Sequence, residues 1–320
     1  MSKTTKIWLI IAAAFLLTGG LVLGSTIVML KGDVLELSTI RYETNTYEIN
    51  HVFEDISINN GTADVVFVPS GNRKCSVVCY EQTNLKHTVT VKDNTLTIDV
   101  LDTRNWYDYI GINFSAPKTT VYLPVGVYGE LFVETDTGTV EVPKDFTFDS
   151  IDISASTGDV KNYASAAGSM KLKASTGDIY VQNVSAGNME LSVSTGKVVA
   201  ADINCVGDFT VKVSTGKSDL KNIRCMNFNS DGNTGDLSMQ DVIATGNLSI
   251  KRSTGKVKIE GCDAPKIKVE TSTGDVTGSL LSEKVFITQT STGKVDTPKT
   301  TTGGTCEITT STGDIKITIQ

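Results

Sequence analysis

Residues 172–179 read Leu-Lys-Ala-Ser-Thr-Gly-Asp-Ile, and close relatives of this phrase return throughout the last two thirds of the chain. The Thr-Gly pair occurs ten times, at intervals of 19 or 20 residues, and Ser precedes it in eight of the ten copies. The glycines are Gly138, Gly158, Gly177, Gly196, Gly216, Gly235, Gly255, Gly274, Gly293 and Gly313. A fixed period of this length predicts a solenoid, in which one supersecondary unit stacks on copies of itself.

Apolar residues keep constant distances from these glycines. The position seven residues before Gly is apolar in all ten copies, and the position five before is apolar in eight, with Ser230 and Thr288 as exceptions. The position two residues after Gly is apolar in nine copies, with Ser218 as the exception. A spacing of two is the strand period, so each unit predicts a strand on either side of Ser-Thr-Gly, with one face buried.

The Ser-Thr-Gly phrase itself predicts a corner between the two strands. Glycine adopts positive φ without steric cost, which sharp corners require. The second half of each unit is rich in Gly, Ala, Ser and Asn and predicts a return arc with a short third strand. The expected fold of residues 131–320 is therefore an all-β, single-stranded parallel β-solenoid of about ten coils of 19–20 residues.

Charges after the glycines support in-register stacking of the coils. From Asp159 to Asp314 this position holds Asp or Lys, and six of the eight successive steps join opposite charges. Unlike charges that face each other on adjacent strands stabilise the pairing by about 0.2–1 kcal/mol. Because a shifted register would lose these pairs, we expect parallel coils about 4.8 Å apart, with identical positions in continuous columns.

Residues 7–30 carry no charge and are long enough to cross a bilayer as a helix. Lys3 and Lys6 precede this segment, so the positive-inside rule predicts a cytoplasmic tail at 1–6, a transmembrane anchor at 7–30 and an extracytoplasmic remainder. A cleaved signal peptide is the alternative, but the apolar stretch is long and lacks an Ala-x-Ala site. Residues 31–50 are expected to form a linker.

Residues 51–130 lack the regular repeat and predict an entry coil followed by a β-hairpin cap. Ile56 to Phe67 fit the repeat pattern with Ala63 in the place of glycine. Strands are expected at 75–80, 88–91 and 95–100, and Lys92-Asp93-Asn94 is a hairpin turn between the last two. Such a cap covers the first edge of the solenoid, which otherwise exposes unpaired strand groups.

The densest aromatic cluster of the chain, Asn105-Trp106-Tyr107-Asp108-Tyr109-Ile110, lies in this cap. Trp106, Tyr107 and Tyr109 are candidates for partner binding, because exposed aromatic rings suit sugar faces and protein partners. Alternatively, the same rings cover the open end of the solenoid.

No pattern in the sequence predicts catalysis, a cofactor or a metal site. The chain has no nucleophile elbow, phosphate loop, His-Glu-x-x-His or Cys-x-x-Cys sequence, and its only histidines, His51 and His87, are expected to be surface or strand residues. Cys205 and Cys225 fall nine residues after consecutive glycines, so they form either a disulfide or, more simply, two small core positions. Residues 31–320 hold 27 basic and 36 acidic residues, a net charge of −9, which argues against nucleic acid as a partner.

The N-terminal anchor, the entry strand, the turn Leu123-Pro124-Val125-Gly126 and the Ser-Thr-Gly-Asp-Val repeats together resemble a bacterial family of β-strand-repeat proteins known as "putative adhesins", a domain of unknown function. The similarity covers about residues 50–320. It implies an envelope-associated, non-enzymatic protein without catalytic residues.

These observations favour a membrane-anchored extracytoplasmic β-solenoid that acts as an adhesin-like scaffold for cell-wall polymer, glycan or another protein. The alternative is an envelope-stress sensor or regulator that acts through a membrane partner. Because the chain stops at Ile317-Thr318-Ile319-Gln320, we also expect an open parallel edge at the C-terminal coil and end-to-end self-association there.

Overall fold

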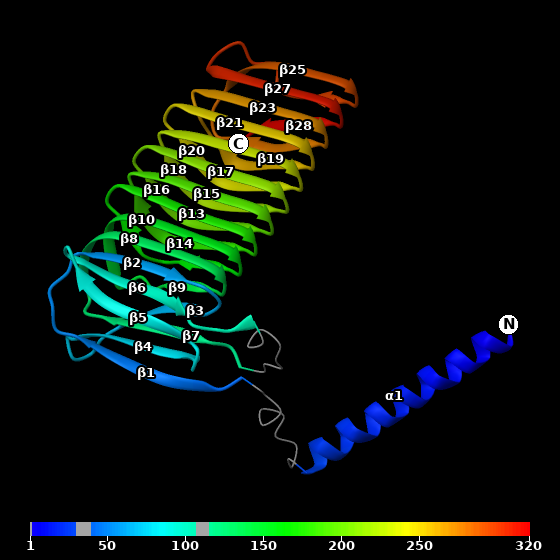
Figure 1. Cartoon of the computed structure of the whole chain (residues 1–320). Coiled ribbons are helices and arrows are strands. Elements are labelled where there is room, and N and C mark those ends of the chain that lie inside the picture. Colours follow the sequence, from blue (N-terminus) through cyan, green and yellow to red (C-terminus); the bar gives the residue numbers. More distant parts are fainter. Residues whose placement is uncertain (1, 30–39, 107–114) are drawn as a thin grey trace.

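The computed structural model describes residues 2–29, 40–106 and 115–320. Residues 3–29 form the helix α1 (Lys3–Met29), and the other regular elements described are β-strands. From residue 126 onward the strands pair in parallel and wind into an elongated solenoid (Figure 1). The predicted all-β solenoid with one N-terminal apolar helix is therefore confirmed.

Two ladders of parallel strands run the length of the solenoid. Strands of the first ladder precede the glycine corner and are β2 (Asp55–Asn60), β6 (Thr95–Asp102), β8 (Gly126–Thr137), β10 (Phe146–Thr157), β13 (Ser169–Thr176), β15 (Asn188–Thr195), β17 (Asp208–Thr215), β19 (Asn227–Thr234), β21 (Asn247–Thr254), β23 (Lys266–Thr273), β25 (Lys284–Thr292) and β27 (Gly304–Thr312). Strands of the second ladder follow the corner and are β3 (Asp64–Pro69), β7 (Lys118–Leu123), β9 (Val140–Val142), β11 (Val160–Asn162), β14 (Ile179–Ala186), β16 (Val198–Cys205), β18 (Ser218–Cys225), β20 (Leu237–Ala244), β22 (Val257–Cys262), β24 (Val276–Leu280), β26 (Val295–Asp296) and β28 (Ile315–Ile319). A two-residue strand, β12 (Ser165–Ala166), lies in the return of one coil.

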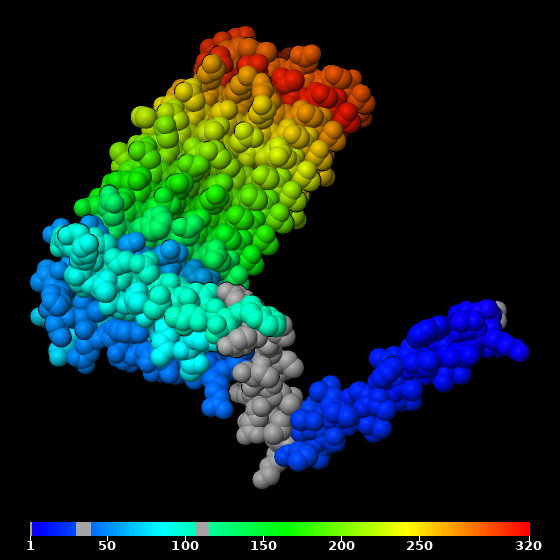
Figure 2. Space-filling view, in the orientation of Figure 1, coloured from blue at the N-terminus to red at the C-terminus, as the bar shows by residue number. Residues whose placement is uncertain are grey.

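Alternation within each strand builds the core. In β13, Met170 and Leu172 are buried, whereas Lys171 faces solvent between them. Leu172 pairs with Ile153 on one side and Leu191 on the other, so identical positions stack as predicted. One continuous apolar column of this kind runs between the two ladders, and the space-filling view shows successive coils as bands along the body (Figure 2).

The glycine corners hold adjacent coils closer than any side chain would permit. At Gly216 φ is +140°, and a Cβ added there would lie 1.7 Å from the carbonyl oxygen of Gly196 in the preceding coil. The Gly216 amide donates to the carbonyl of Thr234 in the next coil, at 2.8 Å. Glycine is therefore required both for the backbone conformation and for the close approach.

The aspartates after the glycines have a role that charge alternation alone does not predict. Asp178 Oδ1 accepts the backbone N–H of Lys197 in the next coil at 2.8 Å, and Asp159 Oδ1 accepts that of Asp178 at 2.9 Å. Lys256 and Asp275 form an ion pair at 3.5 Å, but the lysine is largely exposed. Exposed pairs contribute little, so the carboxylates stabilise the corner mainly as hydrogen-bond acceptors.

A second corner lies six residues after the glycine, within the predicted return arc. Asn183, Asp202, Asn222 and Asp241 have φ between 49° and 56° at this position, and Gly261 follows with 60°. Asn, Asp and Gly tolerate the left-handed region best, so this column of residue types could have revealed the corner. Strand β14 bends at Asn183 and then buries Val184 and Ala186 in a further inward face.

Antiparallel strands cover the first end of the solenoid. Strands β2 and β3 stack on β8 and β9, with Ala63 in the glycine position, and β6 and β7 lie outside them. Strand β4 (Cys75–Gln82) pairs antiparallel with β7, β1 (Tyr42–Ile49) with β4, and β5 (Leu85–Lys92) with β6. Asp93 and Asn94 have φ of 49° and 64°, which a type I′ hairpin turn requires.

At the other end the coils leave sequence order, so the C-terminal coil is not the outermost layer as predicted, although among the described residues Ile317–Ile319 of its last strand pair on one side only. Strand β27 lies between β23 and β25, so the last coil is inserted before the one that precedes it in sequence (Figure 1). Strand β28 pairs with β24 along its length and with β26 at Ile315 and Lys316. The outermost coil is therefore the one that begins with β25, and its inward position carries the polar Thr288, as suits a layer that meets solvent.

Candidate interaction surface

The aromatic loop named from the sequence is described only in part. Trp106 is 77% exposed, so its side chain lies at the surface. Tyr107 and Tyr109 lie outside the described residues. The proposal that these three residues bind a partner remains a prediction.

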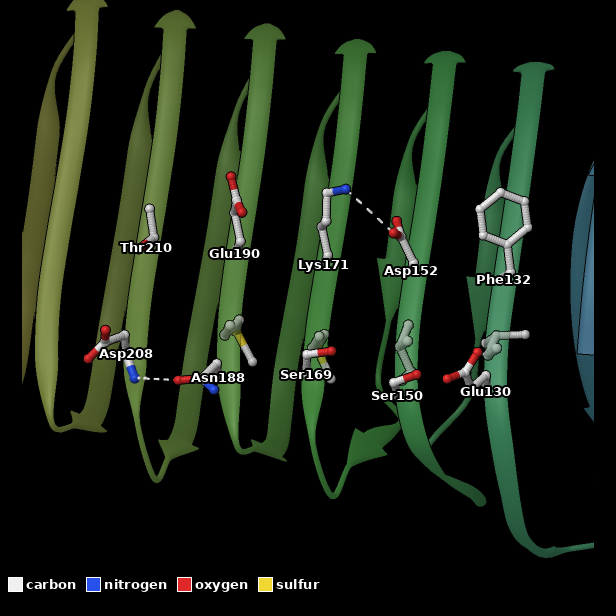
Figure 3. Close-up of a pocket in the computed structure, with 14 residues that line it drawn as sticks. Glu130, Phe132, Ser150, Asp152, Ser169, Lys171, Asn188, Glu190, Asp208 and Thr210 are labelled. Atoms are coloured by element: carbon white, nitrogen blue, oxygen red, sulfur yellow. Dashed lines mark hydrogen bonds and ion pairs between the residues drawn. The ribbon is translucent and has the colours of Figure 1, made fainter. Parts of the chain in front are cut away.

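A groove runs across the outer face of β8, β10, β13, β15 and β17 and encloses about 520 Å³. We call it the strand-face groove. Two rows of outward side chains line it (Figure 3). One row consists of Phe132, Asp152, Lys171, Glu190 and Thr210. The other consists of Glu130, Ser150, Ser169, Asn188 and Asp208.

The solenoid geometry explains why these side chains meet. Parallel in-register pairing places one residue from each coil next to its counterpart, so Asp152 pairs with Phe132 on one side and Lys171 on the other. Neighbouring rows are two residues apart and point to the same face. The sequence pattern contains this alternation, but no conventional motif marks the surface, because its residues are about 20 positions apart in the chain.

Ion pairs and hydrogen bonds order the polar side chains of the groove. Lys171 Nζ lies 3.4 Å from Asp152 Oδ2, and Glu190 Oε1 lies 2.7 Å from Lys212 Nζ at its border. Asn188 Oδ1 accepts the backbone N–H of Asp208 at 3.0 Å. These contacts form an ordered surface with four carboxylates and one ammonium group among the lining side chains.

Phe132 is the aromatic side chain among the described residues that line the groove, and 41% of its surface is exposed. The other described side chains of its two rows carry hydroxyl, amide, carboxylate or ammonium groups. Hydroxyl, amide and carboxylate groups beside an exposed ring are suited to hydrogen bonding and stacking with a polar polymer.

A second polar cluster is buried in the cap. The side-chain ligand atoms of Cys79, Glu81 and His87 lie within 4.8 Å of one another, close enough to consider a metal ion. However, His87 Nδ1 lies 2.5 Å from Glu81 Oε2, and His87 Nε2 lies 2.7 Å from Asn60 Oδ1, so both ring nitrogens are already engaged. Burial also raises the pKa of the Cys79 thiol to about 12, so this thiol keeps its proton at neutral pH when no ion is bound.

This cluster is therefore best described as a structural junction. His87 is a buried strand residue of β5, and its ring connects Glu81 of β4 with Asn60 of β2. Tyr47 of β1 donates a hydrogen bond to the carbonyl of His87 at 2.9 Å. The network thus joins the antiparallel cap to the first parallel coil.

The six cysteines all lie within the described residues, and each is buried and free of a disulfide bond. Cys205 and Cys225 occupy core positions on β16 and β18, as the simpler of the two sequence interpretations holds. Burial raises the pKa of the Cys225 thiol to about 12, and these groups are therefore packed as small apolar side chains.

Helix α1 has the length and composition needed to cross a membrane. The mean hydropathy of its 18-residue apolar stretch is 2.3, and no part of that stretch is buried against the rest of the described chain. An N-terminal signal sequence would have the same properties.

Comparison with known proteins agrees with the repeat pattern and the fold. The family model described as Toastrack DUF4097 matches residues 53–205 and again residues 201–320. No curated protein matches the chain.

The chain also matches solved structures at low sequence identity. A "putative adhesin" from Parabacteroides distasonis has a TM-score of 0.49 and 15% identity, and the match covers 74% of this chain and 97% of that one. Another from Bacteroides fragilis has a TM-score of 0.45 and 15% identity with the same coverage. A third from Parabacteroides merdae has a TM-score of 0.45 and 12% identity over 87% of this chain and 96% of that one.

Because the two family matches together span most of the chain, this protein belongs to the Toastrack DUF4097 family.

Proposed function

We propose that this protein is a non-enzymatic, membrane-anchored scaffold that holds its β-solenoid outside the cytoplasm and binds an envelope polymer. In this proposal α1 remains in the membrane, with Lys3 and Lys6 on the cytoplasmic side. The net charge of −9 on residues 31–320 keeps the solenoid away from anionic lipid and nucleic acid.

The observation that carries the proposal is the strand-face groove. It combines ordered hydrogen-bonding groups with an exposed ring at Phe132, and its two rows repeat at the spacing of the coils. A ligand that itself repeats, such as a glycan chain, can engage several coils at once. Multiple weak contacts of this kind give useful affinity without a deep pocket.

The experiment is a binding assay with the full-length protein in detergent and isolated cell-wall polymer, with liposomes as a second surface. Phe132→Ser removes the stacking ring, and we expect about tenfold weaker retention on the polymer. Val206→Ser is the matched control, because Val206 is an exposed apolar residue outside the groove.

The aromatic loop is tested in the same assay. Trp106→Ser should leave retention unchanged if the groove is the binding surface, whereas loss with Trp106→Ser alone would move the site to the cap. Equal retention of all variants, or retention on liposomes only, would contradict the proposal.

A further inference from the structure

A group of buried polar side chains interrupts the apolar core of the solenoid near Arg252. The position three residues before the glycine is apolar in four consecutive coils, at Ala155, Ala174, Val193 and Val213, and all four are buried. The next two coils place Gly232 and then Arg252 there. Arg252 is only 4% exposed, so a guanidinium group lies inside the core.

Gly232 makes room for this side chain. It pairs directly with Arg252 in the ladder, and a Cβ added to it would lie 1.8 Å from Arg252 Nη1. The guanidinium therefore extends over the coil of Gly232, where Nη2 donates to Ser230 Oγ at 2.9 Å. Ser230 is itself an exception in an apolar column. Two small residues, Gly232 and Ser230, therefore lie beside the large guanidinium group of Arg252.

The remaining donors of the guanidinium have no partner among the described residues. Arg252 Nε and Nη1 are both buried and unbonded within that part of the chain. Ser218 Oγ and Thr271 Oγ1 are also buried and unbonded there. Thr271 pairs with Arg252 in the ladder, and Ser218 faces the interior at the start of β18.

Among the described residues, no carboxylate contacts the guanidinium of Arg252 directly. Asp231 acts on Arg252 through space, but its own side chain is exposed on the outer face of β19. Burial lowers the pKa of Arg252, yet a guanidinium still keeps its proton at neutral pH. A buried charge without a counter-ion is strongly destabilising, and water can satisfy its N–H groups but not its charge.

We propose that a small monovalent inorganic anion, of the size and charge of chloride, is bound inside the solenoid core against Arg252 Nε and Nη1. Thr271 lies in the neighbouring coil on the side away from Gly232, so the two guanidinium nitrogens are the donors that hold the anion. A guanidinium only donates hydrogen bonds and is positively charged, so the group that it binds is a hydrogen-bond acceptor with negative charge. The site is independent of the strand-face groove, because it lies on the inward face of the strands.

The test is thermal unfolding of the full-length protein in detergent, in sodium chloride, sodium bromide or sodium gluconate at equal ionic strength. We expect the Tm to rise by about 3 °C for each tenfold increase in chloride or bromide above the dissociation constant, and not in gluconate, which is too large for the core. Arg252→Met keeps an unbranched side chain of similar length and should lose this dependence. Arg224→Met is the matched control and should retain it, since Arg224 is exposed and donates to the Asp241 carbonyl.

A second measurement does not depend on any variant. Crystals of the wild-type protein grown in bromide should show an anomalous peak beside Arg252. A site occupied by water alone, together with a Tm that is equal in the three salts, would overturn the proposal. If Arg252→Met fails to fold, the bromide peak and the wild-type salt series still decide the question.

Discussion

At the scale of single residues, the glycine corners are the most demanding positions in the chain. Each of these glycines has a positive φ. In addition, a backbone carbonyl of the adjacent coil lies in the space that a Cβ would occupy. The Asp that follows many of them accepts an N–H from the next coil and so links consecutive layers.

Gly216→Ala tests this requirement. We expect it to lower the free energy of unfolding by at least about 2 kcal/mol, because the new methyl group meets the Gly196 carbonyl and the φ of +140° disfavours any side chain. Chemical denaturation followed by circular dichroism measures the change. Gly71→Ala is the control, since nothing lies within 4 Å of a Cβ there, and an equal loss in both variants would refute the argument.

The buried thiols give the stability a pH dependence. The pKa of Cys225 is raised from about 9 to about 12 by burial, so the folded state holds the proton more tightly than the unfolded state. Its contribution is fully present below about pH 9 and is lost as the pH rises from there toward 12. At pH 10 the loss for one thiol is on the order of 1 kcal/mol.

Thermal unfolding in reductant between pH 8 and pH 10.5 measures this effect. Cys225→Ala should show a shallower fall in Tm than the wild type, and Ala244 at the neighbouring position shows that alanine fits this column. Identical slopes for the two proteins would mean that the thiol is accessible to solvent.

At the scale of elements, the bent strands of the second ladder depend on a column of left-handed residues. Asn222 has a φ of 49°, and its Nδ2 donates to Asp202 Oδ1 in the preceding coil at 2.8 Å. A β-branched residue is disfavoured in this conformation, whereas glycine accepts it.

Asn222→Val should therefore destabilise the protein by about 1–2 kcal/mol, and Asn222→Gly by clearly less. Thermal unfolding of the pair compares them directly. Asn229→Val provides the control, because Asn229 is an exposed strand residue whose backbone suits valine. A valine at 222 that is tolerated as well as one at 229 would show that the corner can relax.

At the scale of the whole molecule, both ends of the solenoid depart from sequence order. At the first end, β2 and β3 lie between β8 and β9 and the later strands β6 and β7. At the other end, β27 lies between β23 and β25. In each case a segment from the interior of the sequence forms the outermost parallel layer. The strand inserted beneath that layer, β2 at one end and β27 at the other, pairs with a parallel strand on both of its edges.

Paired cysteines distinguish the two possible orders of the last coils. Glu270 pairs with Thr309, and Thr309 with Gln289, so Glu270 and Gln289 are two layers apart. Glu270→Cys with Thr309→Cys should form a disulfide readily under mild oxidation, because adjacent strands are about 4.8 Å apart. Glu270→Cys with Gln289→Cys should not, and the opposite result would restore sequence order. Mass spectrometry of peptides detects the linkage.

The strand-face groove was only partly predictable from the sequence. Its side chains are the outward residues of strands that the apolar columns had already identified, so their alternation was available. Their assembly into a groove depends on how side chains from five neighbouring strands are arranged in space, which no local pattern reports. The role of His87 was hidden for a related reason, since its partners Glu81 and Asn60 come from two other strands.

The sequence by itself determined the repeat unit, the strands on either side of the glycine corner, the buried columns and the parallel register, because each of these follows from short-range signals that recur in every coil. Only the tertiary structure decided the order of the coils at both ends and the environment of Arg252. The physical reason is that every coil presents nearly the same pairing edge, so local pattern cannot select which coil lies beside which. That choice depends on how well the interior side chains of the two layers fill the space between them.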